Sequence, residues 1–212
     1  MIITYYGKQF FKIQQGDTIF AFNPISKDSK LKAARFGADV AVISLNHADL
    51  NGVESVTYGE KTPFVISGPG EYEIKGIFVR GFLTESSYKK EHKVNTIYVV
   101  SLDGMNLCFL GALQNVELSD KIKEALDDID ILFVPIGGEE VLAPEQAQKL
   151  ATKLAPRMII PMDYGEGSEK NALQQFLKES GVDKVAPIEK LTLKKKDLEG
   201  KEGEIVVLTS QQ

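Results

Sequence analysis

The feature that most constrains the fold is an apolar run without alternation, Val40-Ala41-Val42-Ile43, which leads into a polar cluster, Asn46–Asp49. Apolar side chains at every position are typical of a strand that is covered on both faces, as in the middle of a sheet. Met158–Met162 shows the same pattern and is also followed by a polar residue, Asp163. The sequence therefore predicts central strands whose ends carry polar side chains.

The elements around these runs change character along the chain. The first part reads as short strands, from Ile2–Tyr6 to Met105–Leu110, with hairpin turns at Gln15-Gly16-Asp17 and Asp103-Gly104. Helical spacing then alternates with strands. The helices are expected at Ser119–Asp127, Pro144–Leu154 and Ser168–Ser180. Strands return at Leu191–Lys196 and Ile205–Thr209, and we expect these two to form a charged hairpin with its turn at Glu199–Gly203. This order favours a layered α/β fold, with two mixed sheets packed between helices.

Composition narrows the class of protein. With 212 residues, of which 43% are hydrophobic, we expect a single domain that spans residues 1–212. The net charge of −5 argues against a nucleic acid or an anionic membrane as partner, and leaves a small molecule or a protein. No apolar run is long enough to span a membrane and no secretory signal is visible, so we expect a cytoplasmic protein; its one cysteine, Cys108, suits a reducing compartment.

Three segments, Val42–Gly52, Leu107–Ala112 and Met158–Tyr164, together resemble the metallo-β-lactamase superfamily, in particular its small zinc-hydrolase-like members. Gly68–Glu73 and Asp130–Gly138 support the likeness, which covers most of the chain. The resemblance implies a four-layer αβ/βα sandwich of two mixed sheets flanked by helices. It also implies a pair of zinc ions that would activate a water molecule for hydrolysis.

The metal ligands that the family places on these segments are mostly absent. The resemblance puts metal ligands at seven positions of this chain. Two positions keep a ligand, His47 and Asp49, and a third, Asp163, holds a carboxylate where the family has a histidine. The other four positions hold hydrocarbon side chains, at Leu45, Leu50, Phe109 and Ala112. Nearby, Asn23 stands where Asp is usual, and Lys8 stands after Gly7, where a Gly-His pair is common. Four hydrocarbon side chains cannot bind metal, so the sequence predicts a degenerate metal site.

The three remaining polar residues each allow two interpretations. His47 is a ligand or general base, or a loop histidine that is hydrogen-bonded to Asp49 or to the backbone; we favour the second because its partner ligands are missing. Asp49 is a ligand or a residue that caps loop amides, and Asp163 is a ligand or a turn residue before Tyr164-Gly165. If the hydrocarbon side chains touch, they form an apolar plug in which each large one contributes about 1.5–3 kcal/mol on burial.

Two functions follow. The first is a pseudoenzyme: a member of the superfamily that has lost the zinc pair and hydrolase activity, uses no cofactor, and serves as a binding or assembly module. The alternative is a mononuclear metal-dependent hydrolase for esters or phosphodiesters. It would use His47, Asp49 and Asp163 to hold one divalent ion of manganese, iron, magnesium or zinc. A role in RNA processing ranks last because the chain lacks a basic surface.

Overall fold

The computed structural model describes residues 1–211 and arranges their strands in two mixed sheets. The first sheet has the order β12-β1-β2-β3-β4-β5 and the second has the order β13-β11-β10-β9-β8-β7-β6. The strands of the first sheet are β1 (Ile2–Tyr5), β2 (Phe11–Gln15), β3 (Thr18–Phe22), β4 (Val40–Val42), β5 (Phe64–Ile66) and β12 (Lys190–Thr192). Those of the second are β6 (Gly70–Ile74), β7 (Ile77–Ser86), β8 (Lys93–Leu102), β9 (Met105–Phe109), β10 (Ile131–Pro135), β11 (Met158–Met162) and β13 (Glu204–Ile205).

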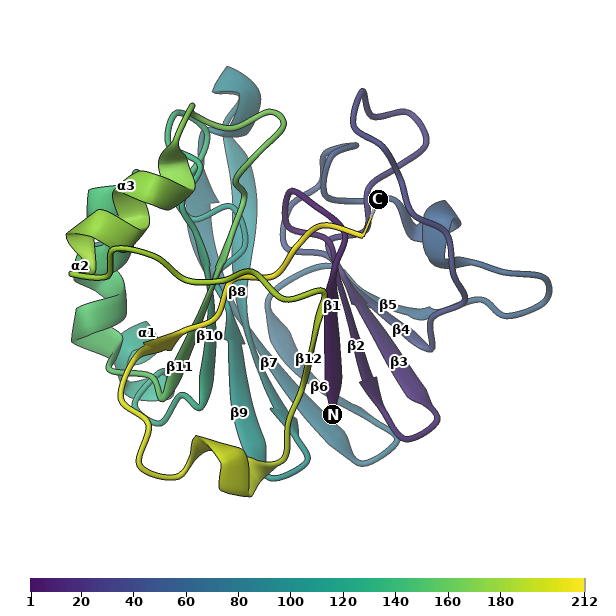
Figure 1. Cartoon of the computed structure of the whole chain (residues 1–212). Coiled ribbons are helices and arrows are strands. Elements are labelled where there is room, and N and C mark those ends of the chain that lie inside the picture. Colours follow the sequence, from purple (N-terminus) through teal and green to yellow (C-terminus); the bar gives the residue numbers. More distant parts are fainter. Residues whose placement is uncertain (212) are drawn as a thin grey trace.

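Helices cover the outer face of the second sheet. They are α1 (Asp120–Ala125), α2 (Pro144–Leu154) and α3 (Ala172–Glu179), and Figure 1 shows all three on one side of the molecule. The outer face of the first sheet packs instead against loop residues between 25 and 38 and against a short 3-10 turn, Val53–Val56. The expected class, two mixed sheets with flanking helices, is confirmed.

The predicted central strands lie where their composition requires. β4 pairs in parallel with β3 on one side and β5 on the other, and all three of its residues are buried. Val40 and Val42 face the core between the sheets, whereas Ala41 faces the loop layer outside. β11 lies between β10 and β13 and is likewise buried throughout. Both runs are therefore apolar at every position because each face is covered.

The hairpin predicted for the tail is wrong. β12 pairs with β1 in the first sheet, and β13 pairs with β11 in the second. The intervening residues contain a 3-10 turn, Lys195–Leu198, whose Leu198 is buried in the core between the sheets. The tail therefore connects the two sheets, as Figure 1 shows by the yellow trace. It can do so because β1 and β11, without the tail, would each have one side with a free row of backbone groups.

Two hairpins are confirmed, at the turns after Gln15 and after Leu102. The predicted third helix begins later than its pattern suggests, at Ala172, because Asn171 has a left-handed backbone with φ of 66°. In residues 1–211, no helix combines the length and the apolar composition that crossing a membrane requires.

Candidate functional site

The candidate site lies at the carboxyl ends of the parallel strands. The loop after β4 carries Leu45 to Leu50, the segment after β9 carries Ala112, and Asp163 follows β11 directly. Ligands of α/β folds commonly bind at such strand ends. A cleft of about 660 Å³ opens here, lined on one side by Lys8, His47 and Asp49. A smaller cavity of about 240 Å³ shares Lys8 and includes Asp163.

Three of the four hydrocarbon positions form one buried apolar cluster beside this cleft. Leu45, Leu50 and Ala112 are each at most 2% exposed, and they pack with Tyr88 and Val141. These family ligand positions therefore belong to a small apolar core. Tyr88 belongs to this core although it follows β7, more than 35 residues beyond Leu50.

Phe109 does not join the apolar cluster, contrary to the expectation of one common plug. Side chains alternate along β9, so Leu107 and Phe109 face the core between the sheets, while Cys108 faces the helices. The Phe109 ring lies 5.1 Å from that of Phe22 and 5.8 Å from that of Phe133, measured between centroids. The position that holds a metal ligand in the family is here part of an aromatic core.

A buried ion pair occupies the deepest part of the site. The Lys8 Nζ lies 2.6 Å from Asp163 Oδ1, and the two side chains are 2% and 0% exposed. Ser168 Oγ donates to the same carboxylate oxygen at 2.9 Å, and Gln9 Nε2 donates to the other at 2.8 Å. The Lys8 ammonium also donates to the carbonyl of Gly167 at 3.3 Å. Both oxygens of Asp163 are thus engaged by the protein itself.

Asn23 links this pair to the loop after β4. Its Nδ2 donates to Gln9 Oε1 at 2.9 Å and to Ser44 Oγ at 2.7 Å, while its Oδ1 accepts the N–H of Ser44 at 2.7 Å. The sequence singled out Lys8 and Asn23 only as departures from the family. Gln9 and Ser168 were missed, although Lys8 and Gln9 are adjacent polar residues before Phe10-Phe11, and both are buried.

His47 and Asp49 lie side by side at the wall of the cleft. The Asp49 N–H donates to His47 Nδ1 at 3.1 Å, and His47 Nδ1 lies 3.5 Å from Asp49 Oδ2. The Asp49 carboxylate accepts from Ser29 Oγ at 2.5 Å and from the Tyr88 hydroxyl at 3.1 Å. Burial first, and then the charges of Asp163 and Asp49, raise the pKa of Tyr88, so the phenol stays protonated and donates.

The donor set at this place does not fit a pair of metal ions. Among residues 1–211, no three His, Cys, Asp or Glu side chains group so that they could hold a metal. His47 and Asp49 come together, whereas Asp163 is bound to Lys8, Gln9 and Ser168. A buried ammonium and a divalent cation would compete for the same carboxylate.

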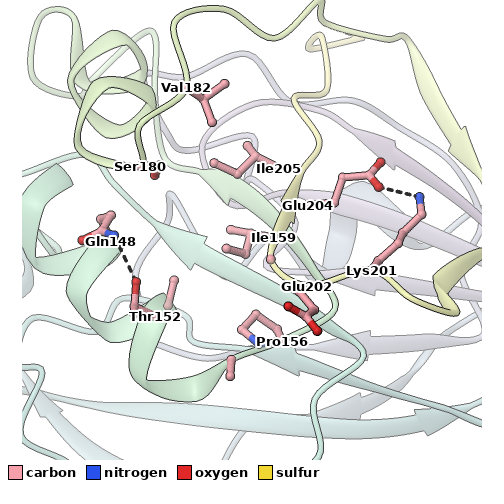
Figure 2. Close-up of a pocket in the computed structure, with 13 residues that line it drawn as sticks. Gln148, Thr152, Pro156, Ile159, Ser180, Val182, Lys201, Glu202, Glu204 and Ile205 are labelled. Atoms are coloured by element: carbon pink, nitrogen blue, oxygen red, sulfur yellow. Dashed lines mark hydrogen bonds and ion pairs between the residues drawn. The ribbon is translucent and has the colours of Figure 1, made fainter.

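A larger groove, of about 840 Å³, lies at the other end of the second sheet (Figure 2). It is bordered by the end of α2, by Ser180 and Val182, and by residues 201–205. Ile159, near the amino end of β11, lines this groove, whereas the predicted site residues lie near the carboxyl ends of the strands. None of them lines the groove.

Two mixed sheets with flanking helices, and a cleft at the carboxyl ends of their parallel strands, define a metallo-β-lactamase type of fold. The profile of the family described as Beta-lactamase superfamily domain matches residues 2–163. The chain belongs to that family.

Named relatives agree with this assignment. A UPF0173 metal-dependent hydrolase of Listeria innocua is 26% identical, over 77% of this chain and 85% of that protein. One of Thermococcus onnurineus is 33% identical over 67 residues, so the match spans only 30% of its length. A Thermotoga maritima structure, assigned to the Zn-dependent hydrolases of the metallo-beta-lactamase superfamily, has a TM-score of 0.76 and 27% identity, and covers 98% of this chain and 97% of its own.

Proposed function

We propose that this chain is a pseudoenzyme of the superfamily: it carries no metal pair, has no hydrolase activity, and uses its cleft as a binding module for a small molecule or a protein in the cytoplasm. The observation that carries the proposal is the ion pair between Lys8 and Asp163, at 2.6 Å and fully buried. A positive charge built into the chain compensates the carboxylate that stands at a metal-ligand position.

The physical argument is one of charge and solvation. A buried carboxylate needs a positive partner and hydrogen bonds, and Asp163 has Lys8 as the first and Gln9 and Ser168 for the second. A metal ion would have to displace the ammonium from Asp163 and from the carbonyl of Gly167. The hydrocarbon cluster of Leu45, Leu50 and Ala112 offers such an ion no ligand.

The alternative remains the mononuclear metal-dependent hydrolase. Its support is the name of the relatives, metal-dependent hydrolase, and the contact between His47 Nδ1 and Asp49 Oδ2 at 3.5 Å. A nitrogen and a carboxylate can share one divalent ion if water completes its coordination shell. Asp163 would not contribute while Lys8 holds it.

Hydrolysis assays separate the two functions. The protein is purified without chelator and supplied in turn with zinc, manganese, iron(II) or magnesium. We expect it to cleave bis(p-nitrophenyl) phosphate and p-nitrophenyl acetate no faster than the same metal does in buffer without protein. The reason is that, within residues 1–211, no three His, Cys, Asp or Glu side chains group so that they could hold a metal ion, which would have to activate the water. Metal-dependent turnover that disappears in the variants Asp49→Asn and His47→Ala would refute the pseudoenzyme and establish the alternative.

A further inference from the structure

The segment Ser87–Lys90, which we call the strap, connects β7 to β8 and inserts one side chain into the apolar cluster beside the cleft. Ser87, Lys89 and Lys90 are exposed, whereas Tyr88 is 0% exposed. Its hydroxyl donates to Asp49 Oδ2 at 3.1 Å. A single phenol is thus anchored by one charged acceptor.

The surroundings of this ring have the composition of a ligand site. Leu45, Leu50 and Val141 form apolar walls. The ring of His47 meets that of Tyr88 edge-on, with the centroids 5.1 Å apart, and the Lys8 Nζ lies 5.7 Å from the Tyr88 centroid. Apolar walls with a few fixed polar groups are what binding pockets of small molecules present, and cations favour aromatic faces.

The backbone of the strap is held in a costly conformation. Lys89 and Lys90 have φ of 55° and 60°, a left-handed region that side chains other than glycine rarely adopt. Contacts at both sides keep the strap closed: the Ser87 N–H donates to Gln114 Oε1 at 2.6 Å, and the Lys89 N–H donates to the Glu140 carboxylate. Opening of the strap would release this strain, at the cost of these contacts and of the burial of Tyr88.

We propose that the buried space beside the cleft, which the chain fills with its own Tyr88, is a site for a small phenol, and that the strap opens to exchange this internal phenol for an external one. The ligand class follows from the groups that now receive the ring: a carboxylate for the hydroxyl, an ammonium near the ring, and apolar walls. The open cleft of about 660 Å³ beside the ring, lined by Lys8, Asp49 and Lys89, provides the entrance. The inference rests on the proposed binding function, because Tyr88 packs on Leu45, Leu50 and Ala112, the positions at which the family has metal ligands.

Cavity complementation with p-cresol, which has the structure of a tyrosine side chain, tests the site. We expect p-cresol to bind the variant Tyr88→Ala and to raise its Tm. In that background, Asp49→Asn should weaken the binding of p-cresol at least about tenfold and leave the binding of toluene unchanged, because toluene has no hydroxyl group. The matched control is Tyr98→Ala, because Tyr98 is equally buried but its hydroxyl meets the carbonyl of Ile43. Equal binding of p-cresol to both cavities, or no loss with Asp49→Asn, would overturn the proposal.

Hydrogen exchange of the unsubstituted chain tests the strap without a cavity variant. We expect the amides of residues 87–91 to exchange by a separate opening, faster than those of β9 and β10. Lys89→Gly should slow this opening about fivefold, because glycine adopts the left-handed conformation without strain. If the amides of the strap exchanged their hydrogens only when the core unfolds, the proposal would be overturned. Neither experiment measures metal, so a failure here leaves the pseudoenzyme standing.

Discussion

The variant Asp163→Asn should lower the free energy of unfolding by about 3–5 kcal/mol, which is the cost of leaving a buried charge without its partner. Asparagine has the shape of aspartate and tolerates the left-handed backbone at this position, where φ is 61°. The loss therefore reports the charge of Lys8, whose side chain is 2% exposed. Urea unfolding, followed by circular dichroism, measures it.

The double variant Lys8→Met/Asp163→Asn is the control. Methionine fills the space of the lysine stem without a charge, so most of the lost free energy should return. If Asp163→Asn alone costs less than about 1 kcal/mol, the value typical of exposed pairs, then Lys8 reaches water and cannot stand in for a metal. The proposed function would lose its main support.

The variant Phe109→His, which restores a family ligand at its matched position, should destabilise the chain by about 3–5 kcal/mol. An imidazole there loses the aromatic contacts with Phe22 and Phe133 and buries a polar ring in the core between the sheets. Added zinc should not restore stability, since the rings around this place, those of Phe11, Phe22 and Phe133, offer no metal ligand. The measurement is urea unfolding with and without zinc.

Phe109→Leu provides the comparison for size. It keeps the position apolar and should cost about 1 kcal/mol. If zinc restored the free energy of unfolding of Phe109→His but not that of Phe109→Leu, metal ligands would still converge on this residue. That result would argue against the loss of the metal site.

Much of the fold could be predicted from local pattern. Val40–Ile43 and Met158–Met162 are apolar throughout, and the strands within them, β4 and β11, each pair with another strand on both sides. The tail could not be predicted, because Leu191 and Ile205 are equally compatible with a hairpin and with two separate edges. Only the free edges of β1 and β11, which are tertiary features, decide between them.

The site could be predicted in part for a similar reason. Leu45, Leu50 and Ala112 were identified by their positions relative to the family, and the structure packs them together. Phe109 follows the period of β9 into the core, a rule that the sequence alone could have supplied. Tyr88 and Ser168 carry no such signal. They reach Asp49 and Asp163 through loops, and loop paths are set by contacts that a sequence does not display.

The changes at the site share one physical meaning. Hydrocarbon side chains fill the place of several ligands, a tyrosine closes the remaining space, and Lys8 neutralises Asp163. Each change alone would weaken a metal centre. By the proposed function, they together put a packed and charge-balanced interior in its place, and by the further proposal this interior exchanges a small ring with solvent when the strap opens.

The most direct test is the metal content of the purified protein. The chain is expressed in medium supplemented with zinc, manganese and iron, purified without chelator, and analysed by inductively coupled plasma mass spectrometry. We predict far less than one ion per chain for every metal, because Lys8 occupies the place of the cation beside Asp163. One or two tightly held ions per chain, lost from the variant Asp49→Asn, would contradict the central claim.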